Sequence, residues 1–537
     1  MIEPEQPLSR RALREARAKG GAVGGSNESA AAAVPLVSDG TDPATEPFGE
    51  PVGDSALEPA PEAPPTGIVA FVRRHPRAVV TTALSIAFLL LATGSLFAGV
   101  AVGSARAVVA APVITATPTP DPRALPSAIA PPSRLRTCSI AELALDERLT
   151  TLHGSVVNAS TGELLWDRLA ATPAQTASVL KILTGAVALS ALGADYRLTT
   201  RVVAGSRPGS VVLIGGGDPT LSRLPAGQES VYPGAPKLAD LAAQTVAAYA
   251  AANPDAPGIT EVVLDSSYWG TGDRWDSSWN RSLQTDGYAS EVTALQVDGD
   301  RDDPRQQISP RSTDPVSRAG AAFAEALAAA GNEAGVPTTS VGAAVGTSVL
   351  AQVQSQPVSS LVTTMMETSD NAIAEMLSRV SSRVIGLDGS AATLTRTFTG
   401  VLNAYGVDTT GITIRDGSGL SSLNAIPAQY VANLLVVVNS GGQGLSVIRD
   451  SLAVAGVSGD LANRFTGPNA IARGAVLGKV GWIGTARTLA GIVQAADGTV
   501  LTFSFYAVRE NVSANTRDAL DSLTTGVFSC GDNLSNN

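Results

Sequence analysis

Lysine is scarce in this chain, and two of its lysines stand where an amine could take part in a reaction. Of the 37 Lys and Arg residues only four are lysine. Lys181 follows Ser178 by three positions, and Lys479 begins a Lys-Val-Gly triplet. Arginine keeps its proton in proteins, whereas a buried lysine can lose it. A chain that carries its positive charge mainly on arginine, but has lysine at these two places, therefore points to proton transfer.

The spacing of Ser178 and Lys181 suits nucleophilic catalysis. Residues 176–192 have helical periodicity and stop at Gly193, and positions i and i+3 of a helix share a face. A serine that opens the helix holds its hydroxyl at the positive end of the helix dipole, which favours a developing anion. A desolvated lysine with a lowered pKa can then take the serine proton. On its own, Ser-x-x-Lys is common by chance.

Two further motifs accompany this pair. Ser369-Asp370-Asn371 interrupts a helical segment over 358–380, and Lys479-Val480-Gly481 precedes a strand-like run. The order Ser-x-x-Lys, Ser-x-Asn, Lys-x-Gly is similar to that of the active-site serine penicillin-recognising enzymes. Coincidence is a poor explanation, because the folded part has only one lysine outside these motifs, Lys237.

The chain resembles the penicillin-binding protein 4 family of serine-type D-alanyl-D-alanine carboxypeptidases and endopeptidases, over about residues 140 to 530. Beside the three motifs, the resemblance is carried by Pro173-Ala174, 214–221, Asp265, Trp279, Thr313-Asp314-Pro315, Ala319, Phe323, Ala374-Glu375, 416–421, Asn424, 455–459 and Arg464-Phe465. It implies an α/β (α+β) fold: a transpeptidase/β-lactamase-like domain of antiparallel sheet flanked by helices, with an inserted mainly-β domain.

The resemblance also implies roles for single residues. Ser178 would be the nucleophile that forms the acyl-enzyme, and Lys181 the base that activates it. Ser369 would pass the proton to the leaving amine, and Asn371 would hold the peptide amide of the substrate. Lys479 would supply positive charge for the hydroxyl network and for the terminal carboxylate of the substrate. No metal or organic cofactor is implied.

The third motif departs from the family pattern. Gly481 and Trp482 would contact the substrate, and the N–H groups of Trp482 and of the nucleophile would form the oxyanion hole. The middle position, which usually holds a hydroxyl that binds the carboxylate of the substrate or of penicillin, is Val480. A lost hydrogen bond to a charged group costs about 1.5–3 kcal/mol. Thr485 and Thr488 are the nearby hydroxyls that could replace it.

Composition excludes several other classes. The net charge of −11 and the pI near 4.9 argue against a nucleic-acid partner. His75 and His153 are the only histidines, so a Ser-His-Asp triad or a His-rich metal site is hard to build, and we expect His153 to be structural. The carboxylates around 298 to 314 lack the spacing of a calcium loop and are expected to lie in a solvated loop.

The N-terminal part is expected to form a membrane anchor. Residues 1–72 have the composition of a disordered cytoplasmic tail, and 106–136 that of a Pro/Ala/Thr-rich linker. Within the segment 73–105, the uncharged run 79–102 is long enough to cross a bilayer, and arginines precede it. The positive-inside rule then places everything downstream outside the cytoplasm, so we expect a single-pass protein of the cell membrane. A late, cleaved signal peptide is the alternative.

The folded part is expected to be discontinuous. We expect a catalytic domain from 137–200 and 351–532, with an inserted domain over 201–350 between the first two motifs. An oxidising compartment favours a disulfide between Cys138 and Cys530 at its two ends, and two free buried thiols are the alternative. The elements expected are a hairpin of 154–158 and 164–168, strands at 210–214, 261–265, 488–494 and 499–508, and a helix at 317–330.

Three functions remain open from the sequence. The first is a membrane-anchored DD-peptidase that cleaves D-Ala-D-Ala, and by extension D-Ala–meso-diaminopimelate cross-links, in peptidoglycan stem peptides, with β-lactams as inhibitors. The second is an inert, peptidoglycan-binding relative, for which Val480 is the main support. The third is a β-lactamase, which also needs a fast deacylating water and seldom carries so large an insertion.

Overall fold

The computed structural model describes residues 134–270 and 272–536. The expected tail and anchor, and most of the expected linker, lie outside these residues. Within the described ranges, no helix combines the length and the apolar character that crossing a bilayer requires.

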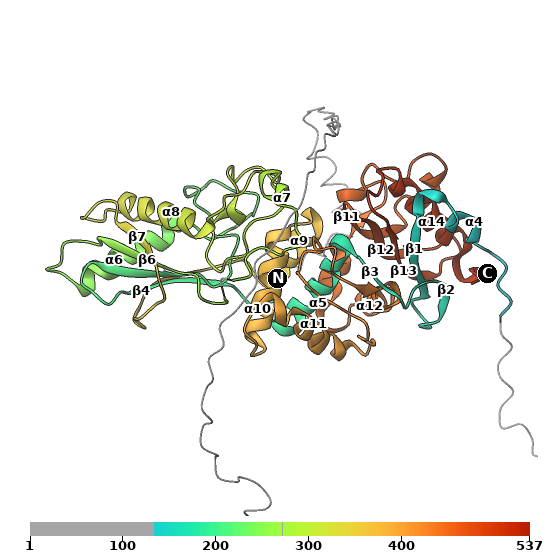
Figure 1. The fold of residues 1–537 in the computed structure, drawn as a ribbon, viewed down its shortest axis with the longest axis horizontal. Helices are drawn as coiled ribbons and strands as arrows, with labels where there is room; N and C mark the ends of the chain where they lie inside the picture. The colour runs from blue at the N-terminus through green and yellow to red at the C-terminus, as the bar shows by residue number, and fades with distance from the viewer. Residues whose placement is uncertain (1–133, 271, 537) are drawn as a thin grey trace, which may run out of the picture. The chain divides into compact units, whose positions relative to one another are not determined.

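A six-stranded antiparallel sheet forms the centre of the fold that carries the three motifs. Its strand order is β10-β11-β12-β13-β1-β2 (Figure 1). The strands are β1 (Thr151–Asn158), β2 (Leu164–Arg168), β10 (Ala453–Val454), β11 (Val476–Ile483), β12 (Ala486–Gln494) and β13 (Val500–Val508). The hairpin predicted at residues 154–168 is confirmed, because β1 and β2 pair antiparallel. His153 is buried in β1, as expected of a structural residue.

Helices cover both faces of this sheet, because successive side chains of each strand point to opposite sides. On β13, Tyr506 packs into one core, whereas Phe503 and Phe505 pack into the other. The first core contains α5 (Leu180–Ala191), α9 (Val358–Thr368), α10 (Asn371–Val384), α11 (Leu394–Leu402), α12 (Ala428–Ser440) and α13 (Ser446–Asp450). The second contains α4 (Ala141–Ala144) and α14 (Thr516–Cys530). A two-residue ladder, β3 (Pro173–Ala174) with β9 (Ile426–Pro427), completes this part.

A second sheet of five strands, in the order β7-β6-β5-β4-β8, is built from residues between the first two motifs. Its elements are β4 (Thr199–Ala204), β5 (Ser210–Ile214), α6 (Leu238–Ala252), β6 (Glu261–Asp265), α7 (Ser282–Thr285), α8 (Pro315–Ala329), β7 (Thr338–Val341) and β8 (Val349–Gln354).

The expectation of a mainly-β insertion is wrong. Strands β5, β6 and β7 are parallel neighbours, and parallel strands require long crossover connections. The helices α6 and α8 provide these connections, and each has 15 residues. The segment is therefore mixed α/β.

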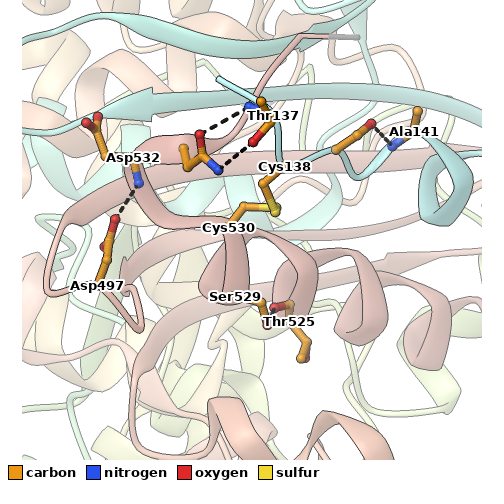
Figure 2. The surroundings of a disulfide bond; sticks show 10 residues. Thr137, Cys138, Ala141, Asp497, Thr525, Ser529, Cys530 and Asp532 are labelled. Atoms are coloured by element: carbon orange, nitrogen blue, oxygen red, sulfur yellow. Dashed lines mark hydrogen bonds between the residues drawn. A yellow bond between two sulfur atoms is a disulfide. The ribbon is translucent and has the colours of Figure 1, made fainter. Parts of the chain in front are cut away.

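The two cysteines join the ends of the described chain. Cys138 and Cys530 form a disulfide across 392 positions (Figure 2). The N–H of Cys138 donates to the carbonyl of Asn533, and the N–H of Ser535 donates back to the carbonyl of Cys138. The side chain of Asn533 makes two further hydrogen bonds with Thr137. The bond therefore closes a contact that the backbone already makes.

Candidate active site

Ser178 stands where a short 3-10 turn, Ala177–Val179, runs into α5. Ala177 before it has φ +44°, a left-handed conformation that a residue other than glycine adopts only under constraint. This turn places Ser178 at the N-terminal end of the helix, half-buried in the wall of a cavity of about 900 Å³. The helix predicted over 176–192 and its end at Gly193 match the structure closely.

Lys181 lies one helical turn further on, fully buried. Its Nζ lies 3.0 Å from Ser178 Oγ, 2.7 Å from Asn371 Oδ1 and 2.7 Å from the carbonyl oxygen of Ser418. Burial, together with the positive charge of Lys479, lowers the pKa of Lys181 to about 7. A neutral amine has two N–H donors and one lone pair. It can donate to Asn371 and Ser418 and still accept the hydroxyl proton of Ser178.

The pKa of Lys181 predicts how activity depends on pH. An amine with the ordinary lysine pKa would be neutral in only roughly 0.03% of molecules at pH 7. With a pKa of about 7, Lys181 loses its proton as the pH rises through neutrality. We therefore expect kcat/KM for acylation to rise with pH through about 7 and then to level off. A profile measured on the free enzyme that keeps rising up to about pH 10 would contradict this assignment.

The second motif lies at a sharp break between two helices. Helix α9 ends at Thr368, Ser369 takes the left-handed conformation with φ +56°, and Asp370 caps α10 by accepting from the N–H of Ile373. This break is the one expected within residues 358–380. It turns Ser369 into the cavity, where its Oγ accepts a hydrogen bond of 3.0 Å from Lys479 Nζ.

Asn371 links Lys181 to the segment 199–354. Its Oδ1 accepts from Lys181, and its Nδ2 donates to the carbonyl of Tyr288 at 2.9 Å. The amide is thereby fixed in one orientation. The site thus joins residues that are far apart in sequence: Ser178 and Lys181 from the 3-10 turn and the start of α5, Ser369 and Asn371 from the helix break, and Lys479 from the sheet.

A buried ion pair holds the second motif in place, and nothing in the sequence indicated it. Arg301 Nη2 lies 2.8 Å from Asp370 Oδ2, with both side chains only 1% exposed. The hydroxyl of Tyr232 donates to the same carboxylate oxygen. Burial pushes the pKa of Asp370 up, but the charge of Arg301 and the hydrogen bonds from Ile373 and Arg301 outweigh it, so the pKa lies below its ordinary value. The segment 199–354 therefore supports the loop of the second motif directly.

The expectation of a solvated loop near residue 300 needs correction. Asp298 and Asp300 are fully buried, although Asp302 is exposed. The buried carboxylate of Asp300 accepts from Ser312 and lies 3.3 Å from Arg318. These partners make burial of the charge possible. The loop carries Arg301 toward Asp370.

Replacing Arg301 with methionine is expected to cost about 3–5 kcal/mol of stability, because Asp370 would remain buried without its partner. Denaturant unfolding measures the loss. The double variant with Asp370→Asn should recover much of it, since asparagine can still cap α10. Arg207→Met, which removes an exposed arginine paired with Glu261, should have almost no effect. Equal losses of stability in Arg301→Met and Arg207→Met would show that the buried ion pair has no special role.

The third motif lies in a strand, β11, that was not expected from the sequence, and the strand-like run predicted after it, 488–494, is β12. Lys479 and Gly481 lie inside β11, paired with Ala490 and Thr488 of β12. Lys479 is buried, and burial lowers its pKa. A Cβ on Gly481 would lie 2.7 Å from the backbone nitrogen of Ser178. The strand thus passes directly beside Ser178.

The neighbours of Val480 do not offer a free hydroxyl in its place. Thr488 Oγ1 is buried and donates to the carbonyl of Thr176 at 2.8 Å. Thr485 lines the cavity but donates to Gln175 Oε1 at 2.5 Å. Trp482 also lines the cavity, with its side chain 58% exposed. The wall made by β11 is therefore more apolar than the family pattern implies.

A loop at residues 416–421 supports Lys181 from behind. Glu375 accepts from the N–H groups of Gly417 and Ser418, and Asp416 accepts from those of Gly419 and Ser421. Burial and the charge of Asp416 raise the pKa of Glu375. These bonds fix the carbonyl of Ser418 that faces Lys181. Gly417-Ser418-Gly419 thus shapes a loop beside Lys181.

Among the described residues, no group of three or more His, Cys, Asp or Glu side chains is arranged to hold a metal ion.

Comparisons with known proteins identify the family of this chain. A sequence model of the "D-Ala-D-Ala carboxypeptidase 3 (S13) family" matches residues 136–303 and 300–527. Carboxypeptidase DacB of Mycolicibacterium smegmatis is 34% identical over 461 residues, which is 84% of this chain and 97% of the relative. A D-alanyl-D-alanine carboxypeptidase of Actinomadura sp. is 28% identical over 435 residues, 65% of this chain and 76% of the relative.

A solved structure has the same fold. Penicillin-binding protein 4 (DacB) of Haemophilus influenzae aligns with a TM-score of 0.59 at 19% identity, covering 72% of this chain and 98% of the other. The resemblance to the penicillin-binding protein 4 family is confirmed. The chain belongs to the D-Ala-D-Ala carboxypeptidase 3 (S13) family, and it is a serine-type D-Ala-D-Ala carboxypeptidase.

Proposed function

We propose that this enzyme releases the terminal D-alanine of peptidoglycan stem peptides through an acyl-enzyme on Ser178. The observation that supports this most is the fully buried Lys181, whose Nζ lies 3.0 Å from Ser178 Oγ. A lysine with a pKa of about 7 is suited to act as a base near neutral pH.

In the acylation step, Ser178 Oγ attacks the carbonyl carbon of the penultimate D-alanine while its proton moves to Lys181 Nζ. The carbonyl oxygen becomes an oxyanion, which the N–H groups of Ser178 and Trp482 would stabilise. Its collapse breaks the C–N bond, and the leaving amine takes up, through Ser369, the proton that Lys181 had accepted. The ammonium group of Lys479 places a positive charge beside the Ser369 hydroxyl. Attack by water on the ester then frees the peptide and restores the Ser178 hydroxyl.

The same acylation should trap β-lactams, because opening of the lactam ring leaves the leaving group attached to the acyl-enzyme. The penicillin-binding protein 4 of Haemophilus influenzae has been crystallised with a β-lactam. Cleavage of D-Ala–meso-diaminopimelate cross-links would use the same steps with a different leaving amine. We propose both as activities of this chain.

Penicillin labelling tests the proposal and separates it from its two rivals. We expect a fluorescent penicillin to form a stable adduct that peptide mass spectrometry places on Ser178. We also expect D-alanine release from a pentapeptide, and the cross-linked dimer peptide tests endopeptidase cleavage. Rapid turnover of the penicillin would favour a β-lactamase. Failure to form any adduct and to release D-alanine would favour the inert binding relative, for which Val480 is the specific argument.

We further propose that the catalytic part faces the outside of the cell membrane, anchored by residues 79–102. The uncharged run preceded by arginines supports an anchor, and the disulfide Cys138–Cys530 fits an oxidising compartment. Protease added to intact spheroplasts should digest the catalytic part. Protection of that part from the protease would refute this topology.

A further inference from the structure

A carboxylate that belongs to none of the three motifs lies beside Lys479. Asp460 Oδ2 is 3.7 Å from Lys479 Nζ. Over residues 134–270 and 272–536, it is the one carboxylate within 4.0 Å of this amine. The side chain of Asp460 is 48% exposed, whereas that of Lys479 is only 3% exposed. Asp460 is therefore the direct counter-charge of a buried lysine.

The fold itself holds Asp460 in this place. It lies in the 3-10 turn Gly459–Leu461, which follows β10, the strand paired with β11. The N–H of Gly456 donates to the carbonyl of Leu461, and Leu461 is buried in the core behind the sheet. The backbone around Asp460 is thus anchored next to Lys479 before any substrate arrives.

A buried amine needs such a counter-charge to stay protonated. Burial favours the neutral form and lowers the pKa of Lys479, and the nearby charge of Asp460 raises it. The residues opposite this part of β11 on the two adjacent strands are Ala453 and Ala490, which carry no charge. Arg487, the charged residue of β12, is a second cation and not a counter-charge. Asp460 is thus the main electrostatic support of the ammonium form.

The other charged groups around the cavity do not take the place of Asp460. Besides Asp460, the charged residues that line it are Asp286, Arg301, Arg311 and Asp370. The carboxylate of Asp370 is paired with Arg301. Both Asp370 and Asp286 lie more than 4.0 Å from Lys479 Nζ. Lys181 on α5 is a further cation when it is protonated, and its charge also opposes that of Lys479.

A protonated Lys479 serves the site in two ways. Its Nζ donates to Ser369 Oγ at 3.0 Å and to the carbonyl of Val480 at 3.3 Å, so the ammonium group is directed at the second motif. Its charge also helps to lower the pKa of Lys181, which leaves much of that amine neutral near pH 7. Loss of the proton from Lys479 would weaken its hold on Ser369 and return Lys181 toward its charged form.

We propose that Asp460 is a positioning residue: it is the counter-ion that keeps Lys479 an ammonium group directed at Ser369. Asp460 then acts on acylation only through Lys479 and takes no part in the bond changes. For its effect on the reaction this inference rests on the proposed function, but the ion pair itself can be measured without a substrate. An amine that stays charged also suits a substrate with a free terminal carboxylate, in keeping with carboxypeptidase activity.

The scarcity of lysine makes a direct test possible, because the full chain has only four lysines. After labelling with ¹³C-lysine, NMR can follow the Cε signal of each lysine as its amine titrates, and Lys479→Met assigns one signal by removing it. In Asp460→Asn, the titration midpoint of Lys479 should fall by about one pH unit, as expected for unit charges roughly 4 Å apart when one is half-exposed. A midpoint equal to that of the wild type would overturn the proposal.

The pH profile of acylation tests the consequence for the reaction. In the wild type, the plateau above pH 7 in the rate of labelling by a fluorescent penicillin should end where Lys479 loses its proton. In Asp460→Asn, it should end about one pH unit lower, so that the rate relative to the plateau falls by up to about tenfold on the alkaline side. The rise through about pH 7, which belongs to Lys181, should stay in place. A profile that keeps the wild-type shape, whatever its height, would overturn the proposal.

Asp450→Asn is the matched control for the loss of one negative charge. Asp450 is 55% exposed, pairs with Arg449 on α13 and does not line the cavity. Its replacement should leave both the midpoint of Lys479 and the pH profile unchanged. Equal shifts in the two variants would refute the role of Asp460, because net charge alone would then explain them. If the wild type takes no label and releases no D-alanine, the proposed function fails, whereas the NMR titration still decides the role of Asp460.

Discussion

Replacing Lys181 with arginine is expected to lower the rate of Ser178 acylation by about 10²- to 10⁴-fold, the usual contribution of a general base. A guanidinium keeps its proton and so cannot accept that of Ser178. It would also place a permanent charge in a fully buried site that already feels the charge of Lys479. The second-order rate of labelling by a fluorescent penicillin, followed in parallel with D-alanine release, measures the loss.

Two companion variants separate loss of the base from loss of the fold. Lys181→Met keeps the length of the side chain and removes the charge, so it should fold and still be inactive. Lys237→Arg changes another buried lysine, whose Nζ donates to the carbonyl of Gln228. It should keep the wild-type rate. Normal turnover by Lys181→Arg, or an equal loss in Lys237→Arg, would remove the case for Lys181 as the base.

The sequence was informative wherever a contact is local. The contact between Ser178 and Lys181 follows from helical periodicity, and the break at Ser369 follows from the interruption of a helical pattern. The helix α6 was missed although its buried residues recur at helical spacing, at Leu238, Leu241, Ala242, Thr245 and Tyr249. That signal was present and could have corrected the mainly-β expectation.

The contacts that complete the site are long-range and leave no local pattern. Arg301 and Asp370 are 69 positions apart, and Tyr232 and Asp370 are 138 apart. No periodicity couples such positions, so only the folded chain reveals the pair. Similarly, Asp460 reads as one more surface carboxylate until β10 and β11 bring it beside Lys479.

Strand β11, which contains the third motif, was missed for a different reason. Gly478 and Gly481 on either side of Lys479 are poor strand formers, so the sequence favours a strand that starts later. In the structure, Gly491 of β12 pairs with Gly478. The backbone of Ser178 lies directly against Gly481. Glycine is used here for close approach of backbones, which propensity does not capture.

Replacing Gly481 with alanine is expected to reduce acylation by at least about 100-fold, as loss of an oxyanion-hole donor does. The added methyl group would lie 2.7 Å from the backbone nitrogen of Ser178 and 2.8 Å from Ala177 Cβ, besides overlapping the hydroxyl of Thr488. The backbone nitrogen of Ser178, in the 3-10 turn before α5, cannot move away without displacing the Ser178 side chain as well. The strand must therefore shift away from Ser178, which widens the oxyanion hole.

Separate measurements of kcat and KM distinguish a widened oxyanion hole from a general loss of structure in Gly481→Ala. Because the oxyanion forms only in the transition state, kcat should fall while KM changes little. Gly400→Ala on α11, where a methyl group meets no atom within 4 Å, controls for glycine replacement and should keep both constants. If Gly481→Ala acylates at nearly the wild-type rate while remaining folded, β11 does not pack against Ser178 during the reaction, and the assignment of the oxyanion hole to this strand fails.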